Sequence, residues 1–191
     1  TFAVDFYKKT LKMNSLPQHF VYRQDVIDFL TVSVQVCGFL EKIAEEDKVE
    51  AVEKLTCLLP MLYLKARLLG KPEQELDDYV ETFCTEDQYE VVRGAVAALF
   101  GSDDTYLEVP VEEGRYGDVS ETRFISEQLA DIYQELFDLA ANYQTQETAV
   151  MNDAILACLE AFEMHWGQKL LSVLRALDVL RNDPEFNNSE D

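Results

Sequence analysis

The sequence has few of the residues from which catalytic sites are most often built. Its 191 residues include only two histidines, His19 and His165, and seven glycines. No G-x-S-x-G motif or Gly-rich phosphate loop occurs, and neither histidine has an evident serine or cysteine partner. The four cysteines form no C-x-x-C pair, so a zinc site is not expected either. Nucleophilic and zinc-dependent catalysis therefore have little support.

Long apolar runs are also missing. No stretch of 18 apolar residues occurs and the first residues lack the apolar region of a signal peptide, so neither a membrane span nor a secretory leader is expected. All four cysteines fall among apolar residues at helical positions, and they are predicted to be reduced core residues in a cytoplasmic protein. They are Cys37, Cys57, Cys84 and Cys158.

Positive charge is scarce. The chain carries 37 acidic and 16 basic residues, a formal net charge of −21, and residues 72–168 hold 23 acidic residues against three arginines. Such a surface repels phosphate backbones and anionic lipids, so neither nucleic acid nor a membrane is an expected partner. A basic protein remains a possible partner. Alternatively, the negative charge serves only to keep the helices soluble. The one basic cluster, Lys8, Lys9 and Lys12, either docks on a partner or membrane surface or packs on the core.

What the chain does have is helical spacing of apolar residues over most of its length, which predicts an all-α, single-domain bundle of about six helices in residues 1–181. Helices are expected over residues 24–46, from a cap at Asp47 to Gly70, over 72–83, from a Thr85 capping box to Gly101, from a cap at Asp118 or Ser120 to Tyr143, and over 147–181.

Three further expectations concern the rest of the chain. The last helix would be about 50 Å long, so it would protrude or pack against a second copy of the chain. Residues 101–118 are predicted to be an irregular acidic arm, with an extended piece near 106–111, that serves as a lid, a contact surface or a connector. The polar tail, 182–191, is expected to be disordered.

Five short runs in the sequence together resemble an uncharacterised, all-helical bacterial family, the domain of unknown function DUF5063. They are LLPMLYLKA (58–66), VSETRFISEQLADIYQELFDL (119–139), MNDA (151–154), HWGQKL (165–170) and LRAL (174–177). The resemblance covers about residues 20–181 and implies a helical fold, a cytoplasmic location and a bacterial source. It carries no activity to transfer. The family continues with a histidine where this chain has Asp178, so a role resting on that histidine is not expected here.

Two acidic pairs at i, i+3 spacing are candidate metal ligands. Glu135 with Asp138 and Glu160 with Glu163 could form a carboxylate cage for Mg²⁺ or Mn²⁺ if their helices lie antiparallel. All-helical nucleotide pyrophosphatases use such a cage, although with the E-x-x-E pair first. So acidic a chain also produces such pairs by chance. The other interpretation is a solvated face with no metal or cofactor.

A second set of residues could line a polar pocket. Glu127 and Asp131 lie one turn apart, and Asp153 either joins them or only offsets the positive end of its helix. His165 and Trp166, with Arg175 further along, could bind an anion, or His165 could be structural. The leading hypothesis for function is a helical interaction or regulatory module that binds another protein and is not an enzyme. The alternative is a metal-dependent hydrolase of nucleotides or phosphate esters.

Overall fold

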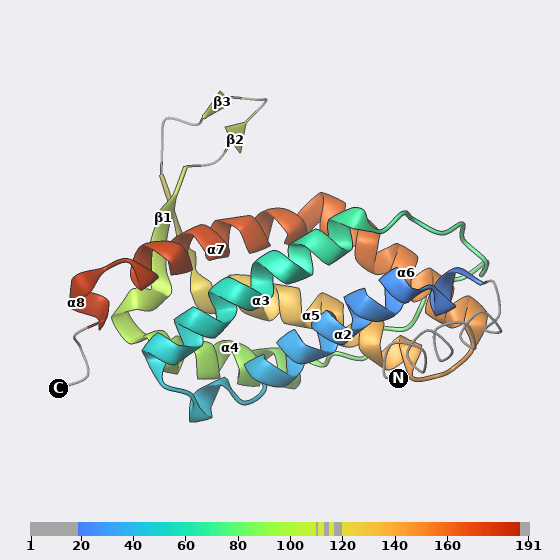
Figure 1. Ribbon diagram of the computed structural model, residues 1–191, viewed down its shortest axis with the longest axis horizontal. Coiled ribbons are helices and arrows are strands. Elements are labelled where there is room, and N and C mark those ends of the chain that lie inside the picture. Colours follow the sequence, from blue (N-terminus) through green and yellow to red (C-terminus); the bar gives the residue numbers. More distant parts are fainter. Residues whose placement is uncertain (1–18, 110, 113–114, 117–119, 188–191) are drawn as a thin grey trace, which may run out of the picture.

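Helices dominate the computed structural model, which describes residues 19–109, 111–112, 115–116 and 120–187 (Figure 1). Six long helices are α2 Gln24–Leu40, α3 Lys48–Leu68, α4 Glu86–Phe100, α5 Ile125–Tyr143, α6 Thr148–Ala161 and α7 Gly167–Arg181. The short elements are η2 Phe20–Tyr22, η3 Ile43–Glu45, η4 Gly101–Asp104, the π-helix η5 Phe162–Trp166, and α8 Pro184–Asn187. The strands are β1 Thr105–Glu108, β2 Val111–Glu112, β3 Arg115–Tyr116 and β4 Glu121–Phe124. The predicted fold, a mostly helical single domain of about six helices, is confirmed. Lys8, Lys9 and Lys12 lie outside the described residues.

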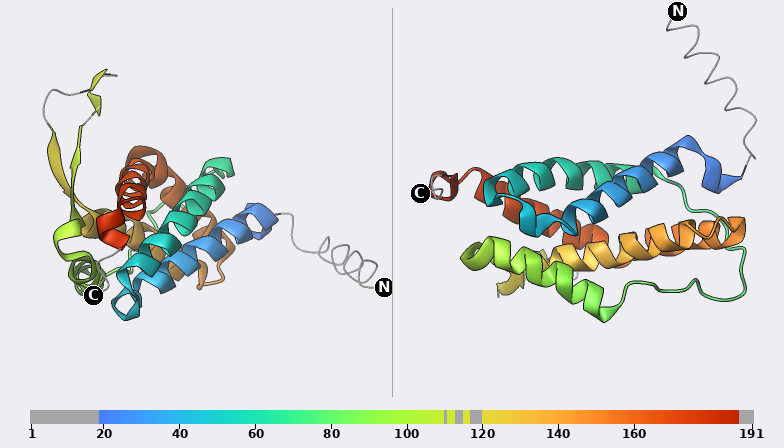
Figure 2. Two further views of the ribbon diagram at one scale, coloured as in Figure 1. Left: turned by 60° about the vertical axis from the view of Figure 1, so that its left-hand side comes forward. Right: turned by 90° about the horizontal axis from the view of Figure 1, so that it is seen from below.

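Helix α5 is the centre of the bundle. It packs against α2, α4, α6 and α7, and α3 in turn packs against α2 and α7. Seen from below, α2 and α3 lie above α4, α5 and α6 (Figure 2). The predicted apolar stripe of α5 is buried along its length: Ile125, Leu129, Ile132, Leu136 and Leu139. Burial of this stripe against four neighbours supplies the hydrophobic contribution that holds the layers together.

Local capping signals set several of the helix boundaries. The Asp47 carboxylate accepts hydrogen bonds from the backbone N–H groups of Val49 (2.8 Å) and Glu50 (3.1 Å). Thr85 forms the predicted capping box at the start of α4, and Gly101 ends α4 with a positive φ of 57°. The prediction that Ser120 caps α5 is wrong, because α5 begins at Ile125. The alternative cap, Asp118, lies outside the described residues. The chain instead stays extended through β4.

The start of α5 is held by a residue from a different element. The Asp104 carboxylate accepts hydrogen bonds from the backbone N–H and the hydroxyl of Ser126, both at 2.7 Å. Strand β1 pairs antiparallel with β4, from Thr105 opposite Phe124 to Glu108 opposite Glu121, and β2 pairs with β3. This hairpin projects from the bundle beside α7 (Figure 1), which confirms the predicted arm. We call residues 105–124 the arm.

The expected single helix over residues 147–181 is interrupted. The π-helix η5 lies between α6 and α7, and the chain changes direction there (Figure 1). The Trp166 indole N–H donates to the carbonyl of Cys158 at 3.0 Å, and the N–H of Gly167 bonds to the carbonyl of Phe162. Helix α6 then packs on α5, and α7 packs on α3 and α5. The expectation that this helix protrudes is therefore wrong, and its length no longer argues for self-association.

Other departures are smaller. Residues 72–83 do not form the expected helix, for the reason given below. Cys57 is exposed and not a core residue, whereas Cys37 and Cys158 are buried. The tail expected to be disordered begins with the short helix α8, whose Phe186 is buried with the Lys48 ammonium 4.9 Å from its ring centre. Among the described residues, no helix is long and apolar enough to cross a membrane.

The turn at η5 requires a glycine. A Cβ atom at Gly167 would lie 2.5 Å from the carbonyl oxygen of Phe162 and 2.8 Å from its ring. We therefore expect Gly167→Ala to lower the free energy of unfolding by about 1–3 kcal/mol, because the Phe162 backbone must move. Gly94→Ala is the matched control. Gly94 is exposed inside α4 with open space around it, so alanine there should raise stability by up to about 1 kcal/mol. Urea unfolding measures both, and equal effects would contradict the packing described for Gly167.

Candidate functional site

Residues 69–85, which we call the strap, join α3 to α4 without forming a helix or a strand. The strap leaves the end of α3, passes around the end of α6 and runs back to the start of α4 (Figures 1 and 2). Leu76, Val80 and Cys84 are half-buried, while most of the other strap residues are exposed. A connection of this length in a compact domain needs its own means of being held in place.

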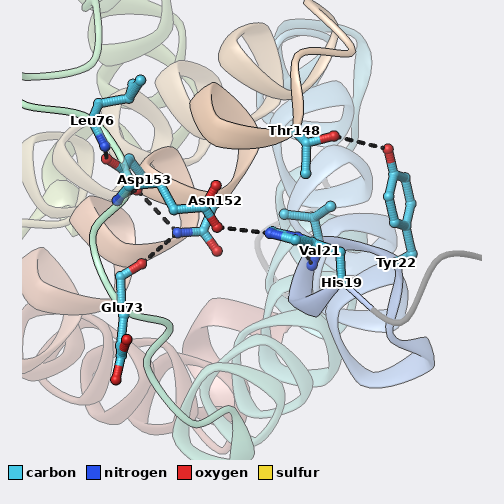
Figure 3. Close-up of polar contacts among 9 residues, drawn as sticks. His19, Val21, Tyr22, Glu73, Leu76, Thr148, Asn152 and Asp153 are labelled. Atoms are coloured by element: carbon cyan, nitrogen blue, oxygen red, sulfur yellow. Dashed lines mark hydrogen bonds and ion pairs between the residues drawn. The ribbon is translucent and has the colours of Figure 1, made fainter.

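Two adjacent side chains of α6 hold the first half of the strap. The Asp153 carboxylate accepts hydrogen bonds from the backbone N–H groups of Glu75 (2.9 Å) and Leu76 (2.8 Å). The Asn152 amide donates to the carbonyl of Glu73 (2.6 Å) and to the Asp153 carboxylate (3.0 Å). Figure 3 shows both side chains pointing from α6 toward the strap. Asn152 and Asp153 are themselves buried, so these bonds are shielded from water.

Two side chains of α5 hold the second half in the same way. One oxygen of the Asp138 carboxylate accepts hydrogen bonds from the backbone N–H groups of Phe83 (2.6 Å) and Cys84 (2.7 Å). The buried Asn142 amide donates to the carbonyl of Glu81 (2.7 Å) and to the carbonyl of Asp138 (2.9 Å). Each helix thus supplies one Asp and one Asn, which bind N–H groups and a carbonyl respectively.

These four side chains explain why the predicted helix at 72–83 does not form. A helix needs the backbone N–H groups of Leu76 and Phe83 for its own i to i−4 ladder, but here they bind carboxylates. Charge-assisted hydrogen bonds of this kind are stronger than those between neutral groups. The tertiary contacts therefore override the weak helical pattern of the segment.

The N-terminal side of the described chain meets the same region. The imidazole Nε2 of His19 lies 2.7 Å from the Glu75 carboxylate, and the hydroxyl groups of Tyr22 and Thr148 lie 3.3 Å apart. Figure 3 shows His19, Val21 and Tyr22 on one side of Asn152 and the strap residues Glu73 and Leu76 on the other. The start of α6 therefore joins the strap to η2.

Asp153 makes the anchoring of the strap sensitive to pH. Burial alone raises the pKa of this carboxyl, but the hydrogen bonds from Asn152 and from the N–H groups of Leu76 and Glu75 outweigh it and lower the pKa. A lowered folded-state pKa means that ionised Asp153 stabilises the fold at pH values above the unfolded-state pKa, about 3.9. The stabilisation is lost as the pH falls through the lower folded-state pKa.

We expect Asp153→Asn to lower the free energy of unfolding by about 2 kcal/mol at neutral pH, because an amide cannot accept both strap N–H groups. The difference between wild type and variant should shrink as the pH is lowered from about 5 to below 3. Urea unfolding across this pH range measures it. The control is Glu160→Gln at an exposed carboxylate, for which a change within about 0.5 kcal/mol is expected. A pH-independent difference for Asp153→Asn would contradict the assigned role of its charge.

A second polar cluster lies where α5 meets α4 and α7. The Asp131 carboxylate accepts a hydrogen bond from the Tyr89 hydroxyl (2.9 Å) and pairs with the Lys169 ammonium (2.5 Å). Burial and then the Asp131 charge raise the pKa of Tyr89. Glu135 is half-buried, and burial followed by the Asp138 charge raises its pKa, while His165 and Lys169 oppose the rise. Exposed Glu127 lies near enough to Tyr89 to act on it electrostatically.

The four carboxylates of the predicted metal cage do not come together. Asp138 is bonded to the strap, Glu163 pairs with the Lys71 ammonium at 2.7 Å, and Glu160 is exposed. Within the described part of the chain, no three His, Cys, Asp or Glu side chains are close enough to hold a metal ion. The interruption at η5 is the physical reason that the i, i+3 argument does not hold, because a π-turn shifts which side chains share a face.

The predicted pocket residues lie in separate places. Asp131 and Glu127 belong to the cluster with Tyr89, and Asp153 belongs to the strap anchors. Trp166 is buried in the core, but its neighbour His165 is exposed. Arg175 lies on α7 beside a cavity at the base of the arm. The sequence therefore identified residues with separate roles, not one pocket.

Sequence reasoning missed Asn142 and Asn152, although each carried a signal. Both lie inside helices at buried positions, among apolar neighbours such as Ala141 and Met151. Asparagine is a weak helix former and is costly to bury without partners, so a buried helical Asn indicates a specific hydrogen-bonded contact. Its pairing with an Asp that also faces the strap could not be read from spacing alone.

The class of protein defined by this fold is an all-helical domain with a strapped connection and a projecting arm. Residues 20–183 match the family described as a domain of unknown function, DUF5063, and the chain belongs to that family. The chain is also similar to protein BF1032 from Bacteroides fragilis, known from a crystal structure. The two are 36% identical, with a TM-score of 0.77, over 86% of this chain and 96% of that one. No curated protein matches the chain. The resemblance noted in the sequence is thus confirmed, and it assigns no activity.

Proposed function

We propose that the protein is an interaction module whose strap binds a basic segment of a partner protein. The observation that carries the proposal is an extended segment that is anchored on its inner side and strongly acidic on its outer side. Residues 73–87 contain seven carboxylates, and no lysine or arginine occurs from residue 72 to residue 92. Opposite charge on a partner would favour association and speed the encounter.

Most of these carboxylates form no ion pair with a described residue. Within the described part of the chain, Glu75 alone among them is paired, with His19. Among the described residues no ion pair is made by the other six: Glu73, Asp77, Asp78, Glu81, Glu86 and Asp87. Elsewhere in the described chain, carboxylates more often form ion pairs. For example, Asp28 pairs with Lys65, and Glu53 pairs with Arg181. The strap therefore concentrates unneutralised negative charge on one exposed segment.

The strap also presents aromatic side chains. Tyr79 is fully exposed and Phe83 is 37% exposed. Tyrosine is enriched among the residues that contribute most to protein interfaces, and its ring can accept a lysine or arginine over its face. Because the backbone is already fixed by hydrogen bonds from Asp138, Asn142, Asn152 and Asp153, little ordering of the strap is needed on binding. An acidic segment that served only solubility would need neither the anchors nor an exposed ring.

We place this interaction in a reducing cytoplasm. The buried thiols of Cys37 and Cys158 form no disulfide, and burial raises the pKa of both groups, so they are unreactive core residues. This chemistry suits a compartment that keeps thiols reduced.

The test uses a fluorescein-labelled peptide in which lysines alternate with leucines, followed by anisotropy at low and physiological salt. Two variants with the same net charge, −17 in place of −21, are compared with wild type. The strap variant carries Glu73→Gln, Asp77→Asn, Asp78→Asn and Glu81→Gln. The control variant changes four exposed carboxylates elsewhere: Glu45→Gln, Glu127→Gln, Glu160→Gln and Glu185→Gln.

We expect the strap variant to bind the peptide at least about 10-fold more weakly, and the control variant to bind within about 2-fold of wild type. Equal weakening in both variants would mean that diffuse charge, and not the strap, attracts the peptide. That result would overturn the proposal.

A single substitution separates the ring from the charges. Tyr79→Ala removes a fully exposed side chain, so stability should not change measurably. Binding of the same peptide should weaken by about 5- to 10-fold if the ring lies in the interface. Unchanged affinity would remove Tyr79 from the contact surface.

A further inference from the structure

A cavity of about 290 Å³ is lined by residues from the base of the arm and from α7. The base of the arm lies at the opposite end of the bundle from the turn of the strap around α6 (Figure 1). Its apolar wall includes the buried side chains of Ile125 and Ala176 and the half-buried Leu180. Leu107 of β1 and Val179 of α7 border it while 70% and 64% exposed. Both are among the six most exposed large apolar side chains of the described residues, and both lie at this cavity.

One polar group at this cavity lacks a partner. Tyr106 lines the cavity, and its hydroxyl is buried with no hydrogen-bond partner among the described residues. It is the single buried side-chain polar atom of the described residues in that condition. Burying a hydroxyl without a hydrogen bond is costly, so such a group indicates that an acceptor is missing.

Protonation of Tyr106 is consistent with a donor role. Burial and then the Glu108 charge raise the pKa of Tyr106 to about 12, with Arg123 opposing the rise. The hydroxyl therefore keeps its proton at neutral pH and would donate to an acceptor on a ligand.

Among the described residues, the charged groups at the cavity include one cation without an ion-pair partner. Asp103 is paired with Lys48, and the Glu108 carboxylate contacts the Ser172 hydroxyl and pairs with Arg123 at 3.2 Å. Arg175 borders the same cavity and forms no ion pair with any described residue, in a chain with 37 acidic residues. The described carboxylates that line the cavity are thus paired with cations, and the unpaired charge among its described lining residues is the positive charge of Arg175.

We infer that this cavity binds a small organic acid, with its carboxylate on Arg175, its apolar body against Ile125, Ala176 and Leu180, and an acceptor oxygen toward the Tyr106 hydroxyl. A guanidinium group matches a carboxylate in geometry as well as in charge. Apolar walls with a few polar groups that orient the ligand are typical of small-molecule sites, and the volume suits a ligand of modest size.

The experiment titrates octanoate into the ¹⁵N-labelled full chain and follows the amide signals of Tyr106, Ser172 and Ala176 by NMR. Octylammonium, with the same tail and the opposite charge, is titrated in parallel. We expect saturable shifts at these three residues with octanoate, with affinity in the millimolar range or better, and none with octylammonium.

Three variants assign the contacts. Arg175→Ala should weaken octanoate binding about 10-fold or more, and Tyr106→Phe about 5-fold. Arg67→Ala is the matched control, because Arg67 is also exposed, lies on α3 and forms no ion pair with a described residue. It should leave the affinity unchanged. Chemical-shift spectra of the free variants show directly whether each is folded.

Three results would overturn the inference. The first is the absence of saturable shifts at the cavity, and the second is equal binding of octylammonium. The third is equal weakening by Arg175→Ala and Arg67→Ala, which would mean nonspecific attraction to cations. None of these results bears on the strap, because the peptide test uses a different surface.

Discussion

The architecture depends on Asp and Asn side chains, three of them buried, that bind the backbone of the strap. Asp153 and Asn152 on α6, and Asp138 and Asn142 on α5, satisfy N–H and C=O groups that would otherwise need a helix, a strand or water. A 17-residue connection of this composition, rich in carboxylates, has little apolar surface with which to hold itself down. The anchors fix its path, and so they also fix which of its side chains face outward.

The same arrangement separates two kinds of surface. On the strap, most carboxylates form no ion pair with a described residue, and they are exposed together with Tyr79. At the base of the arm, Lys48 and Arg123 pair with carboxylates, and Arg175 lies beside an apolar cavity with no ion pair to a described residue. The total net charge of −21 does not show how charge is distributed on either surface. The local pairing of charges decides what each surface attracts, because exposed charges beyond about 10 Å are screened at physiological salt.

Much of the fold could be predicted from the sequence, because apolar spacing and capping signals are local. The stripe of α5, the cap at Asp47 and the box at Thr85 all required only neighbouring residues. The errors have two causes. Residues 72–83 are not helical because side chains about 55–80 positions away take their N–H groups. The helix over 147–181 is interrupted where Trp166 and Gly167 contact Phe162, a local packing arrangement that apolar spacing does not reveal. The long-range contacts also place Asp138 and Asp153 at the strap and pair Glu163 with Lys71. Individual site residues could thus be picked out, but their grouping could not.

The most direct test of the anchoring is amide hydrogen exchange in the strap of the wild-type protein, measured residue by residue by NMR. The anchors predict slow exchange at Glu75, Leu76, Phe83 and Cys84, whose N–H groups bind Asp153 and Asp138. The amides of Asp77, Asp78 and Tyr79, between the two anchor points, should exchange much faster. Uniformly fast exchange across residues 73–84 would contradict the anchoring, and with it the preorganised acidic surface on which the proposed function rests.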